Sequence, residues 1–167
     1  MELTDGKIEG VVVSQLKKFT DERGWLAELF RKDELALEFH PAMCYVSWTQ
    51  PGVVRGPHEH VDQADLFAWF GPGRFKISLW DNRPDSSSFG NRMEFVMGDD
   101  CPGTALIPRG VVHCYRCISE ERGLVINCPN RLFAGEGKHE PIDEIRHEDD
   151  AENPFVKDEL ARRRLAQ

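Results

Sequence analysis

The 167-residue sequence contains no apolar run that approaches the ~20 residues a membrane-spanning helix needs. Its first residues, Met1 to Lys7, lack the basic start and the apolar stretch of a secretory signal. From these two absences we expect a cytoplasmic protein that does not act at a membrane.

Positive charge and a cysteine framework are also missing. With 21 Lys and Arg against 29 Asp and Glu, the formal net charge is -8, which argues against nonspecific binding to nucleic acid. A local group of arginines can still bind a phosphorylated small molecule. The five cysteines are an odd number without the spacing of a disulfide or zinc framework, so we expect reduced thiols.

The sequence does contain a series of short apolar runs, separated by Gly and Pro turns. The runs cover residues 43–48, 65–70, 75–80, 93–97, 104–107, 113–118 and 124–127. Many short strands with turns every ~8–12 residues are typical of a β-sandwich or barrel. Gly71-Pro72-Gly73, between two of the runs, predicts a tight hairpin.

Helical composition is confined to two places. Residues 33–39 suit one or two turns of helix near residue 35, and the tail suits a short C-terminal helix. We expect an all-β jelly-roll barrel domain over residues 10–150 and a tail over residues 151–167. The length is that of a single domain with one core.

Histidines end two of the turn-and-strand segments. One segment is Arg55-Gly56-Pro57-His58-Glu59-His60, and the other is Pro108-Arg109-Gly110-Val111-Val112-His113. His58 and His60 are two residues apart, so they project to the same face of a strand. Strands this far apart in sequence face each other only in a closed or nearly closed β-structure, and we expect the three imidazoles to gather in the mouth of a barrel.

A longer series of motifs follows in order along the chain, at residues 19–28, 52–58, 80–83, 107–113 and 143–149. Together with the histidines they resemble the dTDP-4-dehydrorhamnose 3,5-epimerase family of the cupin superfamily. The resemblance implies a jelly-roll barrel that is usually a homodimer with exchanged strands and needs no metal or other cofactor. It also implies a nucleotide-diphosphate sugar as substrate, a 4-keto-6-deoxyhexose that loses a proton beside the ketone and regains one on the opposite face.

The catalytic roles follow from the same resemblance. His58 matches the base, and an imidazole, which titrates near neutral pH, suits the removal of a weakly acidic C–H proton. His60 or His113 is available to donate a hydrogen bond to the developing enolate. An aspartate from the C-terminal region orients the base in this family, and Lys157-Asp158 is its expected counterpart.

Substrate-binding residues are expected in several segments. Arg23 and Arg55 match positions that bind the pyrophosphate, for which a bidentate guanidinium is well suited. Glu28 matches a position that helps to bind the nucleotide across the dimer. Gln63, just after the first histidine motif, belongs to the same group, and Phe133 is a candidate for stacking on the nucleotide base.

Three positions depart from the family pattern. Asn127, which we count with the catalytic residues, stands where the family has the tyrosine that acts as the acid, and asparagine cannot give up a proton at neutral pH. Asp65 replaces a lysine, and His60 stands where relatives commonly have glutamine. Tyr45 and Tyr115, both expected to line the substrate site, are the only tyrosines that could replace the missing donor.

We therefore expect an epimerase or isomerase, with a single-site epimerisation or a tautomerisation as open as the double reaction. One alternative is a metal-dependent cupin enzyme, because His58, His60, Asp65 and His113 match the loose cupin pattern of three imidazoles and a carboxylate. The other is a non-catalytic protein that binds a sugar nucleotide but has lost the acid.

Overall fold

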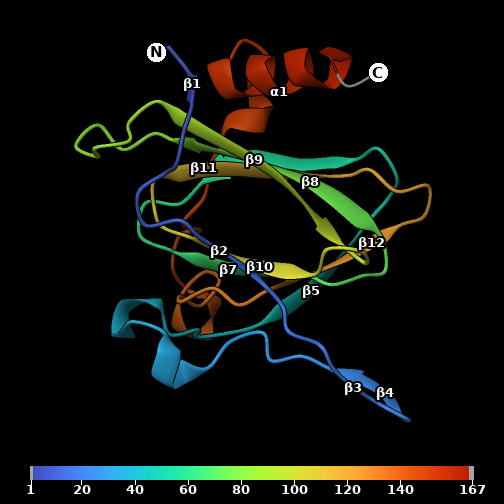
Figure 1. The fold of residues 1–167 in the computed structure, drawn as a ribbon. Helices are drawn as coiled ribbons and strands as arrows, with labels where there is room; N and C mark the ends of the chain where they lie inside the picture. The colour runs from blue at the N-terminus through green and yellow to red at the C-terminus, as the bar shows by residue number, and fades with distance from the viewer. Residues whose placement is uncertain (1, 166–167) are drawn as a thin grey trace.

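Two β-sheets packed face to face form the body of the computed structural model, which describes residues 2–165 (Figure 1). Sheet A consists of β1 (Thr4–Asp5), β6 (Val54–Glu59), β8 (Arg74–Asp81), β9 (Asn91–Gly98), β11 (Val111–Cys117) and β13 (Ile145–Arg146). Sheet B consists of β2 (Val12–Gln15), β5 (Tyr45–Thr49), β7 (Asp65–Trp69), β10 (Gly103–Ile107) and β12 (Gly123–Asn127). The strand orders are β1-β9-β8-β11-β6-β13 and β2-β10-β7-β12-β5, so the predicted jelly-roll barrel is confirmed.

Every predicted apolar run is a strand. The runs correspond to β5 and to β7 through β12, with ends that differ by no more than two residues. Alternation along each strand explains why both sheets have a buried inner face. On β8, Phe75, Ile77 and Leu79 enter the core between the sheets, whereas Trp80 faces the outer side.

The predicted hairpin at Gly71-Pro72-Gly73 was wrong. β7 belongs to sheet B and β8 to sheet A, so these residues carry the chain from one sheet to the other. Gly71 has a φ of +95°, and a Cβ atom there would lie 1.4 Å from Asp99 Oδ1, so the turn requires glycine. Gly and Pro between apolar runs indicate a turn, but they do not indicate which strands pair.

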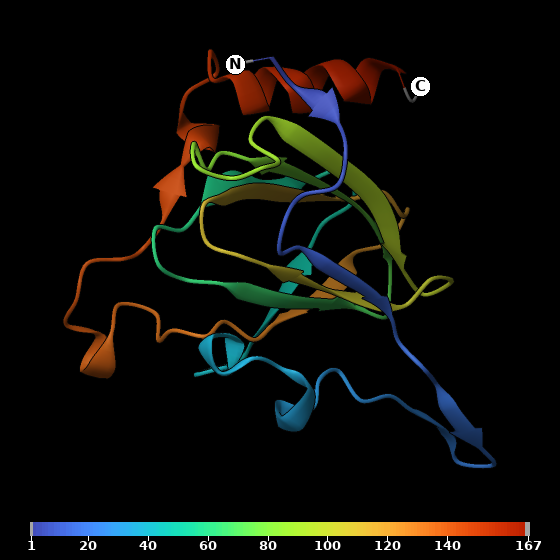
Figure 2. The ribbon, with the colours of Figure 1, turned by 60° about the vertical axis from the view of Figure 1, so that its left-hand side comes forward.

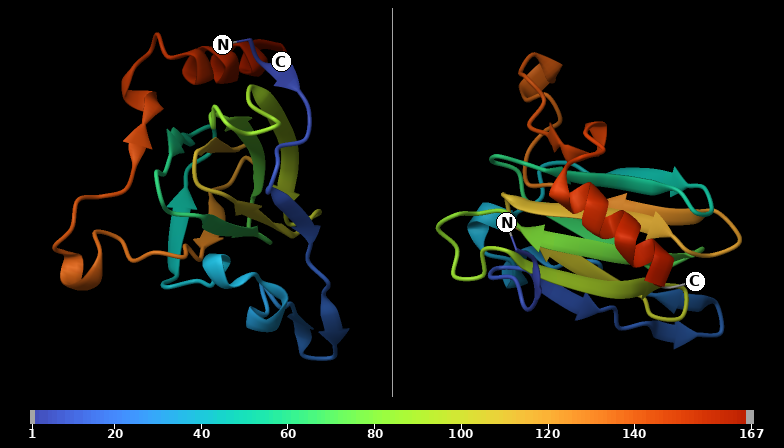
Figure 3. Two further views of the ribbon diagram at one scale, coloured as in Figure 1. Left: turned by 90° about the vertical axis from the view of Figure 1, so that its left-hand side faces the viewer. Right: turned by 90° about the horizontal axis from the view of Figure 1, so that it is seen from above.

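Helical segments cover the outer faces of both sheets. The 3-10 helices η1 (Lys32–Glu34) and η2 (Leu37–Phe39) form the short segment predicted near residue 35, and they lie over sheet B. The C-terminal helix α1 (Pro154–Leu165) lies across the strands of sheet A, as Figure 3 shows. Phe155 of this helix packs with Trp80 on the outer face. The predicted limits 10–150 leave out β1 and α1, which both lie on sheet A, and the domain division stays a prediction.

One hairpin projects from the body. β3 (Phe19–Asp21) and β4 (Gly24–Leu26) pair only with each other and extend beyond sheet B (Figure 2). Its apolar side chains Phe19, Trp25 and Leu26 are about half exposed. No helix among residues 2–165 is long and apolar enough to cross a membrane.

Candidate active site

The two histidine motifs pair with each other in sheet A. His58 of β6 stands directly opposite His113 of β11, and Arg55 stands opposite Tyr115. β6 therefore has one more residue than β11 between these partners, which is a β-bulge at Gly56-Pro57. Gly56 has a φ of +83°, and a Cβ atom there would lie 2.5 Å from the backbone oxygen of His113. The Gly-Pro punctuation thus allows the two histidine-bearing strands to approach closely.

The three imidazoles converge at the inner face of the barrel. The ring centroids of His58 and His113 are 4.5 Å apart, and His60 lies 5.7 Å from each. Asp65, which is 1% exposed at the start of β7, faces them from sheet B. Its Oδ2 lies 3.1 Å from His60 Nε2 and 3.4 Å from His113 Nε2.

The contacts of His60 favour its doubly protonated form. Its Nδ1 faces the backbone oxygen of Asp143 and its Nε2 faces the Asp65 carboxylate, so oxygen acceptors stand at both ring nitrogens. Burial opposes the charge, but the hydrogen bond and the charge of Asp65 prevail and raise the pKa of His60 to about 9. Burial also opposes the charge of the Asp65 carboxylate, but the hydrogen bond and the charge of His60 outweigh it and lower the pKa of Asp65 to about 2.

His113 is neutral although it touches the same carboxylate. Burial, reinforced by repulsion from His58, lowers the pKa of His113 to about 3. Its Nδ1 donates to the Val111 backbone oxygen at 3.1 Å, which leaves a lone pair on Nε2 without a hydrogen-bond partner. The cluster therefore contains one ion pair, between His60 and Asp65, and one buried neutral ring.

These shifts predict a stability optimum near pH 6.5. His60 has a raised pKa in the folded state, so its contribution is complete below pH 6.5 and is lost as the pH rises through about 9. His113 has a lowered pKa, so its contribution is complete above pH 6.5 and is lost as the pH falls toward 3. We expect the alkaline loss to reach about 3 kcal/mol at most. Thermal unfolding followed by circular dichroism between pH 5 and 9.5 measures both limbs.

The variant His60→Gln separates this effect from other groups that titrate at high pH. Its unfolding temperature should fall less steeply above pH 6.5 than that of the unmodified chain, while the acidic limb persists because His113 remains. Equal alkaline slopes in the two proteins would contradict the charged state assigned to His60.

Two glutamates flank His58, and the sequence-based reasoning missed them. Glu144 Oε1 lies 3.8 Å and Glu148 Oε1 lies 3.7 Å from His58 Nδ1, which makes no direct hydrogen bond in the described residues 2–165. Glu144 directly precedes β13, which pairs with β6, and Glu148 lies in η4 (His147–Asp149). Their negative charges lie close to the His58 ring. The only signal in the sequence was the acidic motif at residues 143–149.

The prediction that Lys157-Asp158 supplies the aspartate that orients His58 was wrong. Asp158 accepts hydrogen bonds from Trp80 Nε1 at 2.9 Å and from Arg92 at 2.6 Å, under helix α1. This position lies on the outer face of sheet A, whereas His58 lies on the inner side. A C-terminal aspartate thus fixes the helix to the sheet, whereas the acids beside the imidazole are Glu144, just before β13, and Glu148 in η4.

A cavity of about 1300 Å³ opens beside the imidazoles. Several predicted substrate-binding residues line it, namely Tyr45, Arg55, His60, Gln63, Tyr115 and Phe133. Arg55 is fixed by hydrogen bonds to Thr49 Oγ1 at 3.0 Å and to the Trp48 backbone oxygen at 2.9 Å. A cavity of this size can accommodate a nucleotide diphosphate, and the fixed guanidinium at its wall offers the phosphates a bidentate donor.

Asn127 lies behind this wall and joins two site residues. It is 1% exposed, and its Nδ2 donates to Tyr45 Oη at 2.9 Å and to Asp65 Oδ1 at 2.8 Å. Asp65 also accepts a hydrogen bond from Gln63 Nε2 at 2.9 Å. The predicted catalytic residue thus contacts the histidine cluster through Asp65.

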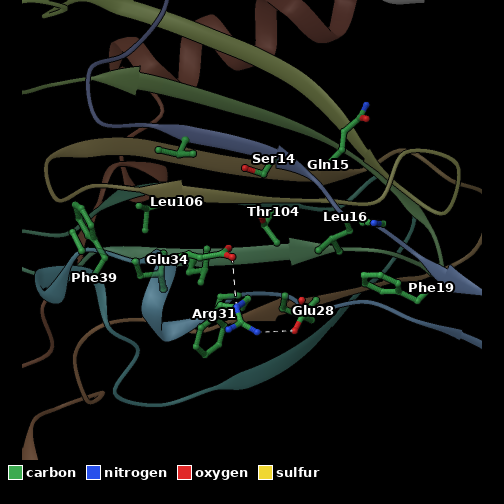
Figure 4. A pocket seen from close by; sticks show the side chains of 17 residues that line it. Ser14, Gln15, Leu16, Phe19, Glu28, Arg31, Glu34, Phe39, Thr104 and Leu106 are labelled. Carbon is green, nitrogen blue, oxygen red and sulfur yellow. Dashed lines mark hydrogen bonds and ion pairs between the residues drawn. The ribbon is translucent and has the colours of Figure 1, made fainter.

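Within one chain, neither Arg23 nor Glu28 lies at this cavity. Arg23 lies on the β3–β4 hairpin with a side chain that is 84% exposed and paired with Asp21. Glu28 lines a second cavity of about 500 Å³ on the outer side of sheet B, where it pairs with Arg31 at 3.4 Å (Figure 4). The roles predicted for these two residues stay predictions.

A comparison with known protein families decides the relationship. The sequence model of the dTDP-4-dehydrorhamnose 3,5-epimerase family matches residues 5–150 of the chain. The chain belongs to this family. The resemblance stated from the motifs is therefore confirmed, and the protein is an enzyme of the nucleotide-sugar epimerase class.

Two curated relatives agree with the epimerase family. The chain is 44% identical over 114 residues to the spore coat polysaccharide biosynthesis protein SpsL of Bacillus subtilis, covering 68% of this chain and 74% of the relative. It is 38% identical over 127 residues to the probable low-salt glycan biosynthesis epimerase Agl13 of Haloferax volcanii, covering 75% and 81%. Both names place these relatives in glycan or polysaccharide synthesis.

The fold of the epimerase family is also found among solved structures. A dTDP sugar isomerase from Desulfovibrio desulfuricans superposes with a TM-score of 0.75 at 23% identity, over 89% of each chain. A dTDP-6-deoxy-D-glucose-3,5-epimerase from Legionella pneumophila, solved with dTDP-4-keto-L-rhamnose, superposes with a TM-score of 0.72 at 20% identity, over 87% of this chain and 76% of the other.

Proposed function

We propose that this family member epimerises a nucleotide-linked 4-keto-6-deoxyhexose with His58 as the base. The observation that carries the proposal is the position of His58. It borders the large cavity, its ring is 15% exposed, and Glu144 and Glu148 flank its Nδ1. An imidazole at a cavity wall accepts a proton from a bound substrate, and the two carboxylates stabilise the imidazolium that results.

The ketone lowers the barrier to proton removal because the electrons move onto its oxygen as an enolate. The His60 imidazolium and the Arg55 guanidinium are among the cations in the cavity wall. In the proposal, His60 supplies the positive potential near the enolate, where a preorganised charge is effective. Arg55 binds the diphosphate, for which its fixed guanidinium is suited.

A second copy of the chain completes the site in this proposal. Arg23 and Glu28 match positions that contact the nucleotide, yet both lie away from the cavity of their own chain. The β3–β4 hairpin projects far enough to reach a neighbour, and its exposed apolar residues Phe19, Trp25 and Leu26 favour a contact with another surface. A homodimer in which this hairpin approaches the partner's cavity satisfies both features.

Deuterium incorporation tests the proposed reaction. Purified protein is incubated in D2O with dTDP-4-keto-6-deoxyglucose, and NMR follows the protons at C3 and C5. We expect exchange at one carbon or both, because His58 abstracts a proton and exchanges it with solvent. A chain that binds the nucleotide in calorimetry but exchanges neither proton would be a non-catalytic sugar-nucleotide binder instead.

A metal-dependent cupin enzyme is the second candidate function. One ligand atom from each of His58, His60 and His113 lies within 4.8 Å of the other two, and these rings are the ones that could hold a divalent ion. The contacts of His60 favour the epimerase, because each of its ring nitrogens already faces an oxygen acceptor of the protein. The same D2O assay includes this candidate. Exchange that persists after dialysis against EDTA supports the epimerase, whereas exchange restored only by added Fe, Mn, Ni or Zn supports the metalloenzyme.

A further inference from the structure

Inversion at carbon needs a proton donor on the face of the sugar opposite to the base. The position at which the family has a tyrosine is Asn127 in this chain, and an amide cannot serve. A phenol nevertheless stands beside it. Tyr45 of β5 is the direct register partner of Asn127 on β12, and the two side chains are joined by a hydrogen bond of 2.9 Å.

The direction of that hydrogen bond leaves the phenol proton available. Asp65 is an ionised carboxylate that only accepts, so Asn127 must direct its NH2 group toward Asp65 Oδ1. The second hydrogen of the same NH2 group points at Tyr45 Oη, which therefore acts as the acceptor. Within residues 2–165, the Tyr45 hydroxyl accepts this hydrogen bond and donates to no protein group. Its own hydrogen is free to point into the cavity that Tyr45 lines.

Tyr45 and His58 approach the cavity from opposite walls. His58 is on β6 of sheet A, and Tyr45 is on β5 of sheet B. Both line the same space between the two sheets. A sugar ring bound there would have the imidazole on one side and the phenol on the other, which is the arrangement that inversion requires.

The other tyrosine, Tyr115, packs in the core between the sheets. Tyr115 is 4% exposed, and its ring packs among the aromatic side chains of Phe67, Trp69 and Phe75. Its hydroxyl is paired with Ser47 Oγ at 3.2 Å. Tyr115 also projects from β11 of sheet A, the same sheet as His58. It therefore lacks the opposing position of Tyr45, and its hydroxyl already has a protein partner.

We propose that Tyr45 is the catalytic acid that faces His58 across the substrate, and that Asn127 is the residue that positions it. This assignment rests on the proposed epimerisation. As the enolate carbon takes the phenol proton, its electron pair forms the new C–H bond, and the O–H bond of Tyr45 breaks. The phenolate then regains a proton from water that enters through the cavity. Burial raises the pKa of Tyr45, with Asp65 adding to the effect, so the group keeps its proton until the carbanion accepts it.

The variant Tyr45→Phe tests the assignment because it removes one oxygen atom and keeps the ring. In D2O, His58 still removes protons and returns deuterons to the same face, so exchange without inversion should remain within about tenfold of the unmodified rate. Inversion, measured from the ring coupling constants of the product, should fall by about a hundredfold or more. Asn127→Ala should lower the ratio of inversion to exchange by roughly tenfold, as expected for one lost hydrogen bond.

Three outcomes would overturn the proposal. If the Tyr45→Phe variant inverts the substrate at a rate within threefold of the unmodified chain, the phenol of Tyr45 is not the donor. Loss of inversion in the Tyr115→Phe variant would then assign the role to Tyr115. Loss of both exchange and inversion, in a variant with an unchanged unfolding temperature and unchanged dTDP affinity, shows that Tyr45 acts in proton removal. An unmodified chain that exchanges protons but never inverts needs no donor on the second face. Failure of the unmodified chain to exchange any proton is a different result, since it removes the proposed function itself.

Discussion

Replacing His58 by asparagine is expected to abolish deuterium incorporation at C3 and C5, with a loss of at least about a thousandfold. The asparagine side chain occupies a similar volume but cannot accept a proton at neutral pH. Arg55 and the cavity remain, so the affinity for dTDP, measured by calorimetry, should change by less than about threefold. Loss of exchange with retained binding separates a chemical role of His58 from a structural one.

The matched control for this experiment is His139→Asn. His139 is exposed and lies in the loop after the 3-10 helix η3 (Glu136–Lys138), and it does not line the large cavity. The control should exchange protons at the unmodified rate. If His58→Asn exchanges as fast as this control, another group removes the proton and the base assignment fails.

The barrel fold and the convergence of the three imidazoles could both be predicted from the sequence, because both depend on local patterns. Alternation places His113 and Tyr115 on the inner face of β11, as it places Phe75 and Ile77 on the inner face of β8. The bulge at Gly56-Pro57 then aligns His58 with His113. Glycine, proline and a period of two are features that a single sequence displays directly.

The carboxylates that flank His58 could not be predicted from the sequence in the same way. Glu144 and Glu148 lie more than eighty residues after it, and they reach its ring because β13 pairs with the edge of β6. β13 is only two residues long, with neither an apolar run nor a turn signal to predict it. Asp143 fixes this segment by accepting backbone hydrogen bonds from Val61, Asp62 and Gln63. Such contacts depend on the tertiary path of a loop.

The charge state of the cluster also emerges only from the assembled structure. His60 and Asp65 each depart from the family pattern, and separately each replacement is hard to interpret. Together they form an ion pair between the two sheets. Because both side chains are largely buried, a charge on either one would be costly without the opposite charge of the other. The two departures therefore make physical sense only as a pair.

Asp65→Asn is accordingly expected to destabilise the fold by about 3 kcal/mol, the second large effect that we predict. The substitution keeps the shape of the side chain but leaves the His60 imidazolium buried without its counter-ion. Denaturation in urea or guanidinium chloride measures the change. The control is Asp33→Asn, which breaks a 2.8 Å ion pair with Arg31 between side chains that are 68% and 47% exposed. It should cost less than about 1 kcal/mol because water screens that pair.

A double-mutant cycle distinguishes the loss of the ion pair from the loss of other contacts of Asp65, which also accepts hydrogen bonds from Gln63 and Asn127. His60→Gln alone leaves the Asp65 carboxylate without its counter-ion and should also be costly. In the double variant neither charge remains, so the combined loss should be smaller than the sum of the two single losses by about 1–3 kcal/mol. Single losses that add within about 0.5 kcal/mol would show that the two groups do not depend on each other. In that case the doubly protonated state of His60, and the positive potential assigned to it beside the enolate, would both have to be abandoned.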